Sequence, residues 1–243
     1  MATDRTRFKN VLKAKEAEAL FTRRQGGVSS GVYGGFNLAY HVGDNTNNVR
    51  QNRMMLSSSL VGNRLVFMNQ QNGDNVVEVR DVPEFEPECD ALITNVPNLG
   101  LGVLMADCAG VLLYDKNNIA IAAVHAGRAG ICARILSKTV AKMGELYGTK
   151  AEDISAFVSA FIKAENYEIG DMDLGEFNKF KTESGRHFDM EAALKAEFEL
   201  LGITDVKFDG ACTFASEADY FSYRRDGVTG RFAGVINIKE AKA

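Results

Sequence analysis

The sequence predicts a single domain of the α+β class, with mixed or antiparallel β-sheets flanked by helices. Helical and strand-like patterns follow one another without the strict order of βαβ units, and a short polar turn joins two strand-like runs in mid-chain. The 243 residues include only three prolines and contain no repeat, low-complexity tract or linker-like segment. We therefore expect residues 1–243 to form one domain, which is long enough to bury a substantial core.

The N-terminal part of the chain is predicted to hold short strands and one helix. Runs rich in β-branched and aromatic residues predict strands at about Ala19–Arg23, Leu65–Met68, Val76–Val79 and Ala91–Thr94. The segment Gln25–Phe36 is too rich in Gly and Ser for regular structure, so we expect a loop there. Thr46–Leu60 is predicted to be a helix, because Asp44 or Thr46 can cap its first turn.

The middle of the chain carries the pattern of a β-hairpin. Two apolar runs, Val111–Tyr114 and Ile119–Val124, flank the polar tetrapeptide Asp115-Lys116-Asn117-Asn118. Asp and Asn favour turns because their side chains bond to nearby backbone groups. We therefore predict two antiparallel strands joined at this tetrapeptide.

Two helices and two strands are predicted after the hairpin. Apolar residues recur at helical spacing over Ala129–Tyr147, and Gly148 can end that helix. A second helix begins after Asp189, its predicted N-cap, and ends before Gly202. Further strands are expected at about Val206–Phe208 and Phe232–Ile238.

Cys108 and His125 are the first candidate site residues. If Tyr114 pairs with Ile119, the same antiparallel register places Cys108 opposite His125, with their Cβ atoms about 5 Å apart on one face. A thiol beside an imidazole can be an activated nucleophile or part of a metal site. The alternative is a small core cysteine and a structural histidine at a strand end. We favour the site, because the chain has only three histidines and a Gly-rich segment follows His125.

Composition excludes several classes of function. The net charge of −4 and the pI near 5.5 argue against a nucleic-acid-binding surface or a polybasic membrane patch. The four cysteines are widely spaced, as expected for reduced thiols in a cytoplasmic protein rather than a disulfide scaffold. The charged N-terminus does not resemble a signal peptide, and no apolar run approaches the roughly 20 residues that span a bilayer. We expect a soluble, cytoplasmic protein, and its oligomeric state stays open.

Three Gly- or Arg-rich segments are further candidates. HAGRAG, residues 125–130, can bring backbone N–H groups and Arg128 close to an anion, although a tight strand-to-helix turn would need the same glycines. Arg224 lies in SYRRDGVTGR, where the arginines bind either a phosphate or neighbouring carboxylates such as Asp226. Asn37 and His41 lie in a Gly-rich loop, where binding residues are common.

Six segments in this order resemble the laccase-domain family, which is also described as YfiH-like or as multicopper polyphenol oxidase. They are FTRRQGGVSSG, FNLAYHVGD, VRQNR, MADCAGVLLYD, VHAGRAG and SYRRDGVTGRFAGVI, spread over about residues 21–238. The resemblance implies phosphorolysis of adenosine, inosine and methylthioadenosine, with adenosine deamination as a side activity. It also implies a purine nucleoside and phosphate as small-molecule substrates.

The resemblance further implies one zinc ion held by His, Cys and His. Cys108 and His125 match the family's cysteine and its second histidine. Asn72 stands where the first histidine of a QVHG-type motif is expected, so we count Asn72 with the catalytic residues but expect only weak or partial zinc occupancy. The motif positions of Arg24, Arg128 and Arg224 suggest that they neutralise phosphate.

A second departure concerns Ser159-Ala160, where the family usually has Gly-Pro. Two other functions stay open. Without the metal, Cys108 and His125 form the pair of a cysteine hydrolase or deamidase. A catalytically degenerate protein that acts in cell-wall precursor quality control is the other. Copper oxidation is disfavoured, because one Cys and two or three His cannot build several copper sites.

Overall fold

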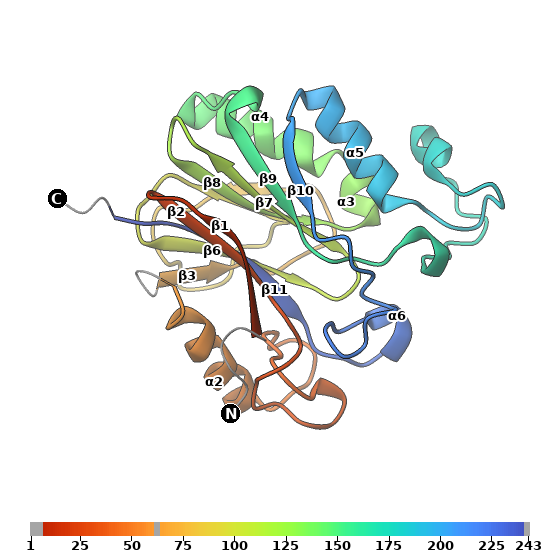
Figure 1. Ribbon diagram of the computed structural model, residues 1–243, viewed down its shortest axis with the longest axis horizontal. Coiled ribbons are helices and arrows are strands. Elements are labelled where there is room, and N and C mark those ends of the chain that lie inside the picture. The colour runs from red at the N-terminus through yellow and green to blue at the C-terminus, as the bar shows by residue number, and fades with distance from the viewer. Residues whose placement is uncertain (1–6, 61–63, 241–243) are drawn as a thin grey trace.

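The computed structural model describes residues 7–60 and 64–240, in which two β-sheets pack face to face and helices cover both outer faces (Figure 1). One sheet has the strand order β1-β2-β11-β6-β3, formed by Phe8–Lys13, Ala17–Thr22, Phe232–Ile238, Leu99–Met105 and Arg64–Phe67. The other has the order β10-β9-β7-β8-β5-β4, formed by Asp205–Phe208, Ile154–Val158, Ala109–Asp115, Ala120–Ala126, Ala91–Thr94 and Val76–Glu78. Three pairs, β3–β6, β4–β5 and β9–β10, are parallel and the others antiparallel. The predicted α+β fold with mixed sheets is confirmed.

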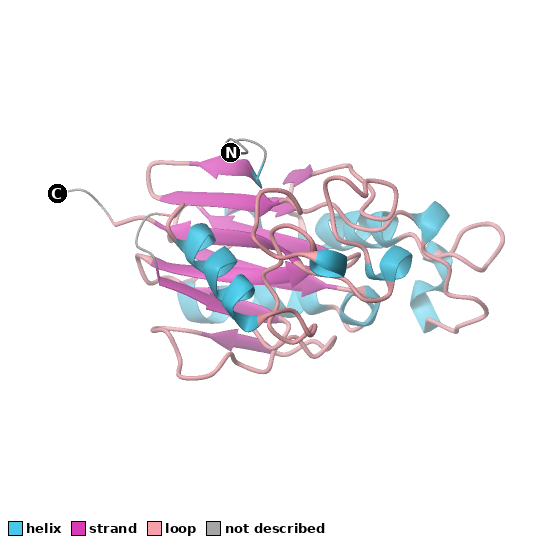
Figure 2. Cartoon of the chain, turned by 90° about the horizontal axis from the view of Figure 1, so that it is seen from below, coloured by secondary structure: helices cyan, strands magenta, loops and turns pink. Residues whose placement is uncertain are grey.

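The helices lie on opposite sides of this sandwich. Helix α2, Thr46–Ser57, crosses the outer face of the five-stranded sheet (Figure 2). Helices α3, α4 and α5, which are Arg128–Cys132, Ile135–Tyr147 and Met190–Leu201, cover the six-stranded sheet. A short helix α6, Tyr223–Asp226, precedes β11, and four 3-10 turns are formed by Gly31–Tyr33, Ala151–Asp153, Ala164–Asn166 and Gly175–Phe180. Of the described helices, none combines the length and apolar character needed to cross a membrane.

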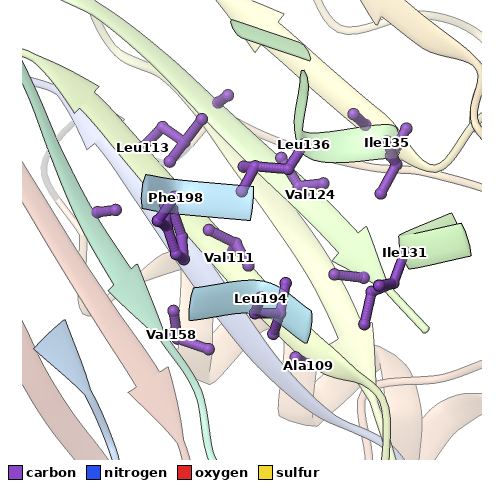
Figure 3. Packing of buried hydrophobic residues seen from close by; sticks show 14 of the residues in the cluster. Ala109, Val111, Leu113, Val124, Ile131, Ile135, Leu136, Val158, Leu194 and Phe198 are labelled. Atoms are coloured by element: carbon purple, nitrogen blue, oxygen red, sulfur yellow. The ribbon is translucent and has the colours of Figure 1, made fainter. Parts of the chain in front are cut away.

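Strand β7 illustrates how the core is layered. Val111 and Leu113 pack against Leu194 and other side chains of the helices (Figure 3). Leu112, the residue between them, packs in the cluster between the two sheets. Since successive side chains in a strand point to opposite faces, both faces of β7 are buried.

The predicted hairpin is present, but its predicted register is wrong by two residues. Tyr114 pairs with Ile121 rather than Ile119, and His125 pairs with Gly110 rather than Cys108. Ile119 was assigned to a strand because it is β-branched, whereas it closes the turn with a φ of 50°. A shift of two residues keeps each side chain on its face of the sheet, so Cys108 and His125 still share one face.

The single helix predicted over Ala129–Tyr147 is also wrong. Arg134 has a φ of 62° and separates α3 from α4. Its side chain lies over the ring of Phe177, 4.7 Å from the centroid, and pairs with Glu176 at 3.0 Å. These contacts come from a distant loop, so the helical periodicity of the segment gives no sign of the break.

Candidate active site

A cavity of about 300 Å³ opens where the chain passes from one sheet to the other. Strand β6 ends at Met105 in the five-stranded sheet, and β7 begins at Ala109 in the six-stranded sheet. The cavity is lined by His41, Asn69, Gln70, Asn72, Leu104, Ala106, Cys108, His125, Tyr223 and Arg231. It therefore unites four of the predicted site residues: His41, Asn72, Cys108 and His125.

The imidazole of His125 is buried and held in a fixed orientation. Its Nδ1 lies 2.8 Å from Oδ1 of Asp90, and its backbone N–H donates to the carbonyl of the same residue at 2.7 Å. Burial by itself would lower the pKa of His125. The electrostatic interaction with Cys108 and hydrogen bonds with Asp90 and Cys108 outweigh this effect and raise the pKa to about 9. Cys108, His125 and Asp90 thus form one polar chain that leads into the cavity.

Asp90 also fixes the loop that carries Asn72. Its carboxylate accepts the backbone N–H groups of Gln71, Asn72 and Gly73 at 3.2, 3.0 and 2.7 Å. Burial opposes ionisation, but the hydrogen bonds from His125 and Gly73 hold the pKa of Asp90 below its usual value. Asp90 was not among the site residues predicted from the sequence. The available signal was an acidic residue directly before the buried strand β5.

Two neighbours fix the place of Cys108. Asp107 adopts a φ of 99°, which non-glycine residues seldom do, and its carboxylate accepts hydrogen bonds from Thr213 Oγ1 at 2.7 Å and Arg224 N at 2.6 Å. On the other side, a Cβ at position 127 would approach Cys108 Sγ to 2.9 Å and His125 Cε1 to 3.6 Å. Gly127 is therefore needed for the close approach of its backbone to the thiol.

The donor set does not fit the three-ligand zinc site that the family resemblance implies. Cys108 and His125 supply a thiol and an imidazole, but the third position is the neutral amide of Asn72, which is a poor zinc ligand. Within residues 7–60 and 64–240, no group of three or more His, Cys, Asp or Glu side chains could hold a metal ion. His41 lines the same cavity, and burial together with the charge of Arg231 lowers its pKa.

The remaining predicted residues lie outside the lining of this cavity. Arg24 donates to the carbonyl of Gly34 at 3.1 Å and lines a separate surface depression. The amide of Asn37 is fully buried, where it accepts the backbone N–H of Arg231 at 2.9 Å. The side chain of Asn37 thereby positions a cavity residue.

Arg128 and Arg224 meet at Tyr167. Arg128, which donates a hydrogen bond to Sδ of Met172, acts to lower the pKa of Tyr167, and the guanidinium of Arg224 lies 5.1 Å from the centre of the Tyr167 ring. The charge of Cys108 acts on Tyr167 as well, after burial the main reason for its raised pKa. The two arginines are thus close to the Cys108 side of the site without facing the cavity.

The chain is similar to known proteins over most of its length, in sequence and in fold. The sequence profile of the family described as multi-copper polyphenol oxidoreductase laccase matches residues 18–239. A purine nucleoside phosphorylase of Corynebacterium glutamicum is 39% identical over 235 residues, which cover 91% of this chain and 95% of that protein. A solved structure from Neisseria meningitidis has a TM-score of 0.87 and 30% identity, covering 96% of this chain and 100% of that one. The hypothetical protein YfiH of Bacillus licheniformis shares the fold, with a TM-score of 0.88, 24% identity and coverage of 97% and 98%.

Proposed function

The chain belongs to the multi-copper polyphenol oxidoreductase laccase family, and from this premise we propose that it is a purine nucleoside phosphorylase. The name of its Corynebacterium relative supports this activity. The observation that carries the proposal is the cavity beside the Cys108–His125–Asp90 chain, because it offers polar groups and one arginine next to a buried imidazole. The substrates proposed are inosine, adenosine and methylthioadenosine with inorganic phosphate, and adenosine deamination is a side activity. We place the reaction in the cytoplasm.

In phosphorolysis, an oxygen of phosphate forms a bond to C1′ of the ribose. The bond from C1′ to the purine breaks, and its electron pair leaves with the base, which takes up a proton. A cavity of this kind contributes by holding the two reactants in line and by stabilising the charge that develops on the leaving base. We assign the proton that the departing purine takes up to the Cys108–His125–Asp90 chain, because Cys108 and His125 line the cavity and Asp90 orients the imidazole.

Zinc is proposed to bind weakly, because Asn72 replaces an imidazole ligand, and copper is not part of the proposal. The predicted phosphate contacts of Arg24, Arg128 and Arg224 rest on their motif positions. No step above requires a metal.

The test is a direct assay of inosine and adenosine with and without phosphate. We expect free base and ribose 1-phosphate to form in equal amounts, and only when phosphate is present. Cys108→Ala and His125→Ala should abolish turnover. Arg80 is an exposed arginine paired with Glu78, so Arg80→Gln should leave turnover unchanged. If the protein turned over neither nucleoside, with or without phosphate, the proposal would be refuted.

A cysteine hydrolase is the second candidate function. The order thiol, imidazole and carboxylate in Cys108, His125 and Asp90 favours it, because this is the arrangement that activates a thiol in Cys–His–Asp hydrolases. Such an enzyme would act without phosphate and would be inactivated by thiol alkylation. Release of base that is independent of phosphate and resistant to a chelator would support it over phosphorolysis.

A further inference from the structure

Arg231 is a cation that lines the cavity. Its backbone N–H is fixed by Asn37, and its Nη1 donates to the carbonyls of Thr229 and Gly230, both at 2.9 Å. Among residues 7–60 and 64–240, no Asp or Glu forms an ion pair with it. A partly buried guanidinium that no carboxylate contacts is costly, unless an anion enters from the cavity.

Burial lowers the pKa of Arg231, whereas the acidic groups of Cys108 and then Asp107 act to raise it. Of these two groups, the carboxylate of Asp107 is already engaged. Asp107 uses one carboxylate oxygen for Thr213 Oγ1 and the other for the backbone N–H of Arg224. The two hydrogen bonds of the Arg231 side chain use Nη1 alone, so within the described part of the chain Nη2 and Nε keep hydrogen-bonding capacity. Nη2 and Nε lie on one edge of the guanidinium plane, the edge that binds two oxygens of a phosphate together.

The other unpaired arginines near the site differ from Arg231 in placement. Arg24 lines a separate depression, and the side chains of Arg128 and Arg224 lie against Tyr167. Of the arginines in the described ranges, Arg231 is the one that shares the cavity lining with Cys108 and His125.

We propose that Arg231 is the residue that binds inorganic phosphate in this cavity, through the Nη2–Nε edge of its guanidinium. The identity of the anion rests on the proposed function. The backbone carbonyls of Thr229 and Gly230 hold the guanidinium in place before phosphate arrives, so little side-chain entropy is lost on binding. His41 lines the same cavity and offers a further hydrogen-bonding group.

The test measures phosphate binding separately from turnover. The thermal midpoint of the protein is followed as inorganic phosphate is added, for wild type, Arg231→Gln, Arg231→Lys, Arg128→Gln and Arg224→Gln, with Arg80→Gln as the matched exposed control. We expect Arg231→Gln to weaken the apparent affinity for phosphate by about 10–100-fold, the range for losing a charged hydrogen-bond pair. Arg231→Lys keeps the charge but loses the planar edge, so its apparent affinity for phosphate should lie between those of wild type and Arg231→Gln. This variant also shows whether the loss in Arg231→Gln comes from a folding defect. In the phosphorolysis assay, the KM for phosphate should rise in Arg231→Gln while the KM for inosine changes little.

The possible outcomes separate this inference from the proposed function. A phosphate response that is lost in Arg231→Gln, in a protein that turns over no nucleoside, would support the anion site and refute the phosphorylase. Phosphate-dependent turnover with an unchanged KM for phosphate in Arg231→Gln would support the phosphorylase and overturn the role of Arg231. Loss of the phosphate response in Arg128→Gln or Arg224→Gln, with Arg231→Gln unaffected, would also overturn it and assign phosphate to the Tyr167 side.

Discussion

Asp90 connects the two halves of the site at the scale of single residues. One carboxylate orients the His125 ring and receives three backbone N–H groups of the loop that carries Asn72. Such a residue acts through its neighbours, so its substitution should change both catalysis and the local structure. The role of Asp90 cannot be predicted from local sequence, because only the fold brings position 90 to positions 72 and 125.

Replacement of Asp90 by Asn keeps the shape of the side chain but turns one of its two acceptor oxygens into an NH2 donor. We expect turnover to fall by about 10–100-fold, as for partners that orient a site histidine, and the free energy of unfolding to fall by about 1–3 kcal/mol. Nucleoside assays and urea unfolding measure the two effects. Full activity with an unchanged unfolding midpoint would show that Asp90 has no positioning role.

We predict that Asn72 limits the zinc affinity of the site. Wild-type protein purified without a chelator should contain well under one zinc per chain, and Asn72→His should raise the occupancy by supplying a third strong ligand. Loss of a residue that only orients a metal ligand typically lowers the metal affinity by about 10–100-fold. Loss of a ligand itself should lower the affinity by at least as much. Metal analysis by mass spectrometry checks this. Full occupancy in the wild type would mean that another residue, with His41 the best candidate, completes the site.

At the scale of elements, the β7–β8 turn fixes the register that brings Cys108 and His125 onto one face. The fully buried Asp115 accepts the backbone N–H groups of Asn117 and Asn118 at 2.9 and 3.1 Å. Its other oxygen accepts the Asn118 side chain at 2.9 Å. Burial opposes ionisation, but hydrogen bonds, among them those from Asn118, hold the pKa of Asp115 below its usual value.

The lowered pKa of Asp115 predicts a pH dependence of stability. A group with a depressed pKa stabilises the fold above its unfolded-state pKa of about 3.9, and this contribution is lost as the pH falls through the folded-state value. Asp115→Asn should therefore reduce the free energy of unfolding by about 1–3 kcal/mol at pH 7. The difference between wild type and variant should shrink toward pH 3. Urea unfolding at several pH values measures this. A difference that grows as the pH falls would contradict the assignment.

At the scale of the whole molecule, the site depends on a strand that is buried from both sides. Leu112 packs between the sheets, and Leu113 packs beneath the helices, both without solvent exposure. Leu112→Ala and Leu113→Ala should each lower the free energy of unfolding by about 2–5 kcal/mol. The exposed Val82→Ala is the control and should stay within about 0.5 kcal/mol. If only one of the two leucines mattered, the layered description of β7 would be wrong.

The sequence by itself determined the elements whose pattern is local. Ala91–Thr94 and Phe232–Ile238 were predicted with their observed bounds, and the helix after Asp189 was predicted from its cap and its apolar face. The meeting of Cys108 and His125 also followed from the sequence. Side chains alternate with a period of two, so this meeting survived a register error of two residues.

Only the tertiary structure decided the features that depend on distant contacts. Strand β6 was missed because Gly100 and Gly102 weaken its pattern, although strands on either side hold it in the sheet. The break at Arg134 depends on Phe177 and Glu176. The roles of Asp90 and Arg231 depend on which groups the fold brings together around the cavity. Pattern and propensity act over a few residues, whereas a buried charge is placed by the partners that the folded chain supplies.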